Sequence, residues 1–131
     1  MIVIEMNRIL MVVLAVVVCV ASALPSHAAA EPRAVLIVGD SLSAAYGINQ
    51  DEGWVTLLQK RIAAERPDFR VVNASISGDT TRGGLGRIDA LLRRHQPAVV
   101  VLELGGNDGL RGLPLKDMQT NLSAMISKSL A

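Results

Sequence analysis

The stretch Val35-Leu36-Ile37-Val38-Gly39-Asp40-Ser41-Leu42 decides the fold. It begins as an apolar run that is too short to span a membrane and is rich in β-branched side chains, which is typical of a buried parallel strand. The run ends abruptly in Gly-Asp-Ser, so Ser41 is expected at the carboxyl end of the strand. In open α/β sheets ligands bind at that end, where a serine can present its hydroxyl to a cleft. The stretch therefore predicts an α/β fold with a candidate nucleophile at the rim of its sheet.

A Gly-Asp-Ser tripeptide has a second reading, in which Asp40 and Ser41 only cap the next helix. Two further turns argue for more than a cap. Residues 76–80 (Ile-Ser-Gly-Asp-Thr) and 104–109 (Leu-Gly-Gly-Asn-Asp-Gly) also follow apolar, strand-like runs. Because the carboxyl ends of parallel strands meet at one edge of a sheet, the three turns are expected to converge on one rim.

Helical and strand-like patterns alternate along the rest of the chain. We expect helices over residues 52–66, from Thr80 or Thr81 to about Arg94, and after Leu113-Pro114, with strands over 70–74 and 98–104. This alternation predicts a parallel sheet with right-handed crossovers and the spatial strand order 2-1-3. Gly83, Gly84 and Gly86 are expected to make the start of the second helix irregular or mobile.

Each predicted helix carries an apolar face that we expect to pack against the sheet. We interpret Trp54 as a helix-packing residue rather than a ligand platform, and Met118 and Met125 as core residues. The three faces are Trp54, Val55, Leu57, Leu58 and Ile62; Leu85, Ile88, Leu91 and Leu92; and Leu115, Met118, Leu122, Met125 and Ile126.

The first thirty residues have the pattern of a secretory signal peptide. Arg8 precedes an apolar block over residues 9–23, and Ser26-His27-Ala28-Ala29-Ala30 offers small residues at cleavage spacing. The alternative is a membrane anchor, but the block is shorter than the roughly 20 residues that a span needs. The chain is therefore expected in the periplasm or outside the cell, with a mature domain over residues 31–131. Cys19 lies inside the block as an apolar residue, so the mature chain would have no cysteine and no disulfide.

Composition and charge exclude several classes of protein. The chain has a net charge of +1, 50% hydrophobic residues and 2% aromatic residues, which describes one small globular domain without affinity for nucleic acid. Gly83-Gly84-Leu85-Gly86 does not follow a strand directly, so it disfavours a nucleotide-binding domain. We interpret Asp40, Asp79 and Asp108 as residues that bond to the backbone of their turns. Their spacing does not demand a metal ion, and we predict neither a metal nor another cofactor.

At this point the chain can be compared with a known family. Gly39-Asp40-Ser41-Leu42, residues 73–80 (Asn-Ala-Ser-Ile-Ser-Gly-Asp-Thr) and residues 103–112 (Glu-Leu-Gly-Gly-Asn-Asp-Gly-Leu-Arg-Gly) resemble the first three blocks of the SGNH (GDSL) hydrolases. They are most similar to the periplasmic arylesterase, acyl-CoA thioesterase and lysophospholipase group. The resemblance implies a flavodoxin-like fold of three α/β/α layers, incomplete at the carboxyl terminus.

The resemblance also implies roles for three residues. Ser41 would be the nucleophile, and its own N–H, the Gly78 N–H and the Asn107 side-chain amide would stabilise the oxyanion. These roles agree with the chemistry, because an ester or thioester carbonyl attacked by a serine becomes an oxyanion that needs hydrogen-bond donors. A glycine at position 78 lets its backbone donor approach a substrate without a Cβ in the way. The alternative is that Gly78 is only a turn glycine and Asn107 only a helix cap. The expected substrate is a small ester, a thioester or a lysophospholipid.

The general base is the largest departure from the family pattern. The family takes it from a late Asp-x-x-His block, whereas the histidines of this sequence are His27 and His95. His95 is expected at a helix end, opposite the rim, and is not expected to act as the base. We therefore expect the amino-terminal portion of a hydrolase, with impaired activity, an exposed apolar edge on its third strand and poor solubility.

A non-catalytic ligand-binding remnant of the same fold is the alternative function. Arg111 and Leu113 are expected near the rim, where they can touch an acyl chain. We expect no stable membrane span after signal cleavage, and the oligomeric state stays open.

Overall fold

The computed structural model describes residues 31–131, so the predicted signal peptide lies outside the described residues. The predicted alternation of strands and helices is confirmed, and the short helix α4 is an element that was not predicted. The elements in chain order are β1 (Arg33–Gly39), the short 3-10 helix η1 (Gln50–Glu52), α2 (Trp54–Glu65), β2 (Phe69–Asn73), α3 (Thr81–His95), β3 (Val99–Glu103), α4 (Gly106–Leu110) and α5 (Leu115–Leu130).

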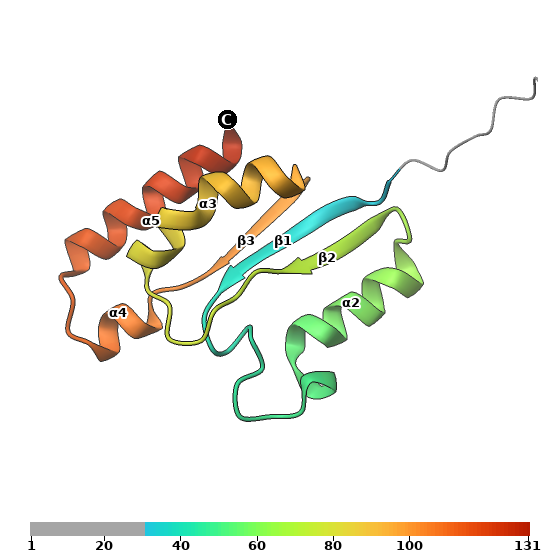
Figure 1. The fold of residues 1–131 in the computed structure, drawn as a ribbon, viewed down its shortest axis with the longest axis horizontal. Helices are drawn as coiled ribbons and strands as arrows, with labels where there is room; N and C mark the ends of the chain where they lie inside the picture. The colour runs from blue at the N-terminus through green and yellow to red at the C-terminus, as the bar shows by residue number, and fades with distance from the viewer. Residues whose placement is uncertain (1–30) are drawn as a thin grey trace, which may run out of the picture. The chain divides into compact units, whose positions relative to one another are not determined.

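The sheet is parallel and has the predicted order, β2-β1-β3. β1 is the central strand, and Leu36 pairs with Val72 on one side and Val100 on the other. The loops that follow the three strands emerge at the same end of the sheet, where α4 also lies (Figure 1). This arrangement places the three predicted turns on one rim.

Alternate residues of β1 belong to two separate cores. Leu36 and Val38 pack with Ile88 of α3 and Met125 of α5. Val35 and Ile37 pack on the other face with α2. Figure 1 shows the same layering, with α3 and α5 on one side of the sheet and α2 on the other. Burial on both faces explains why β1 reads as a continuous apolar run instead of an alternating one.

The apolar helix faces are narrower than predicted. On α2, Trp54 is 38% exposed, so most of its surface is buried, whereas Leu57 is 52% exposed. On α5, Leu115 is 63% exposed and Ile126 is 50% exposed. The physical reason is that the sheet has three strands and is therefore too narrow to cover the whole width of an apolar helix face.

The start of α3 is regular, which corrects the expectation of an irregular turn. The Thr80 side chain caps the helix by accepting a hydrogen bond from the Gly83 N–H at 3.3 Å. Gly83 and Gly84 serve close packing, whereas a Cβ on Gly86 would meet open space. A Cβ on Gly83 would lie 1.8 Å from Asp79 Oδ1, and one on Gly84 would lie 2.4 Å from a methyl carbon of Leu104.

β3 lies at an edge of the sheet, as predicted, and Val99 at its start is 45% exposed. This leaves apolar strand surface uncovered within residues 31–131. None of the helices in that range combines the length and the hydropathy that crossing a membrane requires.

The layering predicts different costs for two neighbouring residues of α5. Met125 is fully buried, so Met125→Ala should lower the free energy of unfolding by about 2–5 kcal/mol. Ile126→Ala, at a position that is 50% exposed, should lower it by about 1 kcal/mol or less. Urea unfolding followed by circular dichroism measures both. Equal losses would contradict the placement of α5 on the sheet.

Candidate active site

The first turn of the site follows β1 and is tied to the end of β3. Asp40 is 3% exposed, and its Oδ1 accepts a hydrogen bond from the Leu42 N–H at 3.0 Å. Glu103, the last residue of β3, accepts from the Ser43 hydroxyl at 2.8 Å and from the Asp40 N–H at 3.5 Å. A Cβ on Gly39 would lie 2.6 Å from Ser43 Oγ, so the glycine is what allows this approach. The turn that carries Ser41 is thus fixed on both sides of that residue.

The second turn follows β2 and contains Gly78 at φ +79°, a conformation that favours glycine. The Asp79 N–H closes the turn by donating to the Ile76 carbonyl at 3.0 Å. The turn is also attached to its neighbours. The Ile76 N–H donates to the Gly39 carbonyl at 3.0 Å, and Arg111 Nη2 donates to the Gly78 carbonyl at 2.7 Å.

The third turn contributes Asn107, which lies in α4 and joins the other two turns. Its Nδ2 donates to Asp40 Oδ2 at 3.0 Å and to the Asp79 carbonyl at 2.9 Å. Asp40 precedes Ser41 in the chain, and Asp79 follows Gly78. The structure therefore brings together the three turns that carry Ser41, Gly78 and Asn107.

Several backbone N–H groups at this rim have no acceptor, and those of Ser41 and Gly78 are among them. Within residues 31–131, neither the Ser41 N–H nor the Gly78 N–H makes a hydrogen bond, although the N–H groups of Asp40, Leu42 and Asp79 do. Ser41 is half-buried, and its hydroxyl makes no hydrogen bond in the same range. Ser41, the predicted nucleophile, and two of the predicted oxyanion donors are thus without a partner among the described residues.

The side-chain amide of Asn107 is held in place by two hydrogen bonds, so neither of its N–H hydrogens is free for a ligand. It has two N–H hydrogens, and both point at acceptors, the Asp40 carboxylate and the Asp79 carbonyl. An oxyanion at this rim would have to share one of these hydrogens. Because the Asp40 carboxylate is the stronger acceptor, the hydrogen that faces the Asp79 carbonyl is the easier one to share.

Asp40 and Asp79 accept from backbone N–H groups of their own turns, which confirms their interpretation, whereas Asp108 binds the first residue of α3. Asp79 Oδ1 accepts from the Thr80 N–H at 3.0 Å. Asp108 is 3% exposed and accepts from the Thr81 N–H at 2.9 Å and the Thr81 hydroxyl at 2.5 Å. Within the part of the chain that the structure describes, no group of three or more histidine, cysteine, aspartate or glutamate residues is arranged to hold a metal ion.

Sequence reasoning missed two residues that organise this rim. Glu103 carries a carboxylate at the end of an apolar strand, and that break in the pattern was the available signal. Arg87 lies in α3 and contacts the loops that follow β1 and β2, and its position in a helical pattern gave no signal. Arg111 was expected to touch an acyl chain, whereas here its guanidinium binds the Gly78 carbonyl.

His95 does not lie at the rim. It is the last residue of α3, and the chain then enters the amino end of β3 at Val99. The rim lies at the carboxyl ends of the strands. The expectation that His95 is not the base for Ser41 agrees with this position.

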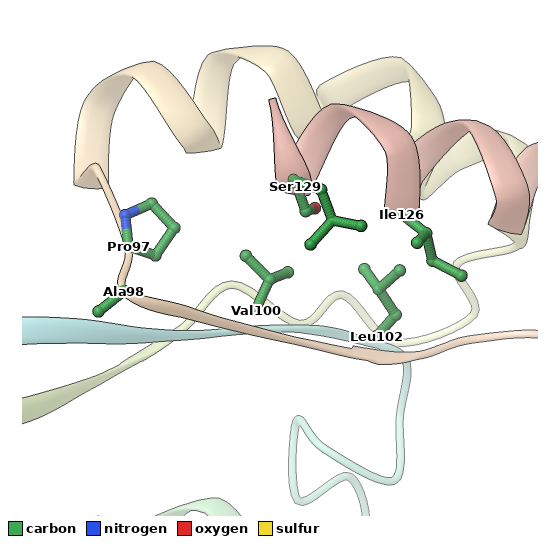
Figure 2. A pocket seen from close by; sticks show the side chains of 7 residues that line it. Pro97, Ala98, Val100, Leu102, Ile126 and Ser129 are labelled. Atoms are coloured by element: carbon green, nitrogen blue, oxygen red, sulfur yellow. The ribbon is translucent and has the colours of Figure 1, made fainter.

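An apolar groove lies elsewhere, between β3 and α5 (Figure 2). It has a volume of about 200 Å³ and is lined by Pro97, Ala98, Val100, Leu102, Ile126, Ser129 and Leu130. Val100 and Leu102 point from the strand toward the helix (Figure 2). Its one hydroxyl, on Ser129, donates to the Met125 carbonyl at 2.8 Å. The groove therefore lacks acid, base and free nucleophile, and the rim is the better candidate for chemistry.

The sequence of the chain is similar to those of two curated relatives. The chain is 56% identical over 113 residues to Esterase TesA of Pseudomonas aeruginosa, covering 86% of this chain and 56% of the relative. It is 46% identical over 98 residues to Thioesterase 1/protease 1/lysophospholipase L1 of Escherichia coli, covering 75% of this chain and 46% of the relative. The chain thus spans about half the length of these relatives.

Solved structures give the same result for the fold. The crystal structure of TesA superposes with a TM-score of 0.72 at 59% identity, covering 74% of this chain and 54% of that one. The psychrotrophic esterase EstA from Pseudoalteromonas sp., in a structure inhibited by monoethylphosphonate, superposes with a TM-score of 0.70 at 57% identity, covering 75% and 54%. The resemblance in fold is therefore shown by coordinates as well as by motifs.

A family profile covers most of the chain. The profile described as the GDSL-like Lipase/Acylhydrolase family matches residues 37–131, which include all three turns of the rim. Together with the fold and the relatives, this match establishes that the chain belongs to the GDSL-like lipase/acylhydrolase family, also called the SGNH hydrolases.

Proposed function

We propose that this chain supplies the nucleophile and the oxyanion donors of a serine hydrolase for carboxylic esters or thioesters. Ser41 Oγ attacks the carbonyl carbon as its proton passes to a base, and the carbonyl electron pair moves onto oxygen. Collapse of the tetrahedral intermediate breaks the ester or thioester bond, releases the alcohol or thiol, and leaves an acyl group on Ser41. Water then hydrolyses the acyl-enzyme, giving the carboxylic acid and free serine.

One observation carries this proposal. The amide nitrogen of Asn107 binds the residue before Ser41 and the residue after Gly78, which joins the nucleophile turn to the turn of an oxyanion donor. The unpaired N–H groups of Ser41 and Gly78 add to it, since donors that await charge are what such a reaction needs. Family membership supports the same roles.

The substrate class rests on the relatives and on the surface around Ser41. The relatives are named esterase, arylesterase and thioesterase 1/lysophospholipase L1. We therefore place small esters, thioesters and lysophospholipids among the substrates. Exposed apolar side chains on the loops of the rim would contact the acyl or aryl group, and they are Leu42, Ile76, Leu110 and Leu113.

The described residues include no histidine near Ser41 that could accept its proton. The one histidine of the described part, His95, lies at the end of α3, away from the rim. This observation favours slow turnover by the chain as given. It also supports a second candidate function, a ligand-binding module of the same fold that does not turn over.

Export is part of the proposal. The basic Arg8, the apolar block over residues 9–23 and the small residues up to Ala30 support a signal peptide and a location in the periplasm or outside the cell. A mature amino terminus near Glu31, measured by mass spectrometry of the protein recovered from the exporting cell, would support this route. Recovery of the uncleaved chain in the cytoplasm would contradict it.

The first test of catalysis is covalent labelling. A fluorophosphonate should phosphonylate Ser41 slowly, with fluoride as the leaving group and the serine proton passing to the buffer, because the donors proposed for the oxyanion can also stabilise the charge that develops on the phosphoryl oxygen. Mass spectrometry of the digested protein should find the adduct on Ser41. Ser41→Ala should abolish labelling, whereas Ser123→Ala, at an exposed serine of α5, should leave it unchanged. A wild-type chain that is never labelled would favour the non-catalytic module.

The second test separates the role of Asn107 from its contribution to stability. Asn107→Ala should lower the rate of Ser41 labelling by about 100- to 1000-fold, the usual cost of one oxyanion donor. Asn121 is a matched control, because its amide also donates a hydrogen bond, to Thr81 Oγ1 at 3.1 Å, but from α5. Asn121→Ala should lower the free energy of unfolding by about 1 kcal/mol with no change in labelling rate. Similar labelling rates in the two variants would refute the role of Asn107.

The third test uses two glycines with almost the same backbone φ angle. Gly78 has φ +79° and Gly47 has φ +80°, so alanine should introduce similar strain at both, about 1–2 kcal/mol. Only Gly78→Ala should slow labelling of Ser41, because its Cβ would crowd the donor. Labelling kinetics and urea unfolding of both variants give the comparison, and equal labelling rates would show that Gly78 is a turn residue alone.

A further inference from the structure

Arg87 makes the densest set of polar contacts at the rim, and no step of the reaction above uses it. Its side chain reaches from α3 to the ends of two strands and is 21% exposed. The guanidinium donates to the carbonyl of Ala74, just beyond β2, and at 3.5 Å to the carbonyl of Gly39, the last residue of β1. It also binds Asp79 Oδ2, with Nε at 2.9 Å and Nη2 at 2.8 Å.

These acceptors lie directly beside the candidate catalytic groups. Gly39 is two residues before Ser41, and Asp79 directly follows Gly78. Ala74 begins the loop that leads to Gly78. The Arg87 side chain thus binds the backbone just before Ser41. It also binds both ends of the loop that contains Gly78.

Asp79 connects Arg87 to Asn107. Its carboxylate accepts from Arg87, and its carbonyl accepts from Asn107 Nδ2 at 2.9 Å. A hydrogen-bonded path therefore runs from Arg87 through Asp79 and Asn107 to the Asp40 carboxylate. A displacement of Asp79 would move the carbonyl that Asn107 binds. It would also move Gly78, the residue directly before it in the chain.

The first turn of α3 is shaped around this pair. Gly83 faces the Asp79 carboxylate so closely that a Cβ there would lie 1.8 Å from Oδ1. This observation is independent of the Arg87 contacts. The Asp79 carboxylate is thus held by Arg87 on one side and lies against Gly83 on the other.

A guanidinium suits this place for physical reasons. It carries a permanent charge and several N–H donors in a rigid planar fork, so it can bind carbonyl and carboxylate acceptors in different directions at once. A lysine would keep the charge but has a single nitrogen on a flexible stem. It could not hold all three acceptors at fixed separations.

We propose that Arg87 is a positioning residue for the hydrolase reaction, which sets the separation between the Ser41 turn and the Gly78 turn without contacting substrate. The inference rests on the proposed function. It makes a distinct claim, that Arg87 affects the chemical step through Asp79 and not only the stability of the fold.

The test is Arg87→Lys in the full chain, with Arg94→Lys as the matched control on an exposed residue of the same helix. Saturation kinetics of Ser41 labelling by a fluorophosphonate separate reagent binding (KI) from the bond-forming step (kinact). Arg87→Lys should lower kinact by about 10- to 100-fold, the cost of misplacing reacting groups by a fraction of an ångström to an ångström, and leave KI within about twofold. Arg94→Lys should leave both constants unchanged.

A second readout does not depend on reactivity. In 15N–1H spectra of the uniformly labelled chain, Arg87→Lys should shift the Gly78 N–H and the Asn107 side-chain amide, and Arg94→Lys should not. Asp79→Asn provides a second variant in case Arg87→Lys does not fold. It keeps the carbonyl that Asn107 binds but removes the charged acceptor, and it should lower kinact in the same direction.

The outcomes separate the two proposals. A wild-type chain with no labelling at Ser41 would overturn the hydrolase function, and the role of Arg87 with it. Wild-type labelling together with unchanged kinact and unchanged Gly78 and Asn107 signals in Arg87→Lys would overturn the role of Arg87 alone. A loss of unfolding free energy with unchanged kinact would likewise show that Arg87 is only structural.

Discussion

The hydrogen bonds of a single side-chain amide are the interaction on which the candidate site depends. Asn107 Nδ2 lies 3.0 Å from a carboxylate oxygen of Asp40 and 2.9 Å from the carbonyl of Asp79. The sheet order β2-β1-β3 brings the two turns to the same rim, but a sheet sets such distances only to within a few ångströms. The amide sets them more finely, because a hydrogen bond weakens steeply as its length and angle depart from the optimum. Catalysis by donors on separate loops requires that finer control.

The polar groups beneath the rim are almost fully satisfied. Asp40, Ser43, Thr81 and Asp108 are buried, and each has a hydrogen-bond partner. Among the described residues, Ser75 Oγ is the buried side-chain atom that has none. A buried polar network that is satisfied in this way favours one arrangement of the loops, since each alternative leaves a group unpaired in a low-dielectric interior. The loops of the rim are thus held by satisfied side chains, whereas several backbone N–H groups, including those of Ser41 and Gly78, have no acceptor within residues 31–131.

The sequence pattern predicted the features that depend on neighbouring residues in the chain. The apolar run before Gly39 predicted a central strand, the alternation of helices and strands predicted the parallel order, and the Thr80 cap predicted the start of α3. The meeting of the turns followed from topology, because parallel strands end at one edge.

Other features depend on which segments meet in three dimensions. Glu103 binds the Ser43 hydroxyl across 60 positions of sequence, and Arg87 reaches the Gly39 carbonyl across 48. The carboxylate at the end of an apolar strand marks Glu103 as unusual but does not identify its partner, and nothing near Arg87 in the chain marks it at all. The exposure of Leu57 was missed for the same reason, since an apolar stripe does not tell how much of it a narrow sheet can cover.

The most direct measurement of the central claim is a crystal structure of this chain with a phosphonate bound covalently to Ser41, whose phosphoryl oxygen stands in for the carbonyl oxyanion. We expect this oxygen to lie about 2.7–3.1 Å from the backbone nitrogens of Ser41 and Gly78 and from Asn107 Nδ2. A phosphoryl oxygen that points to solvent, with the three donors turned elsewhere, would contradict it.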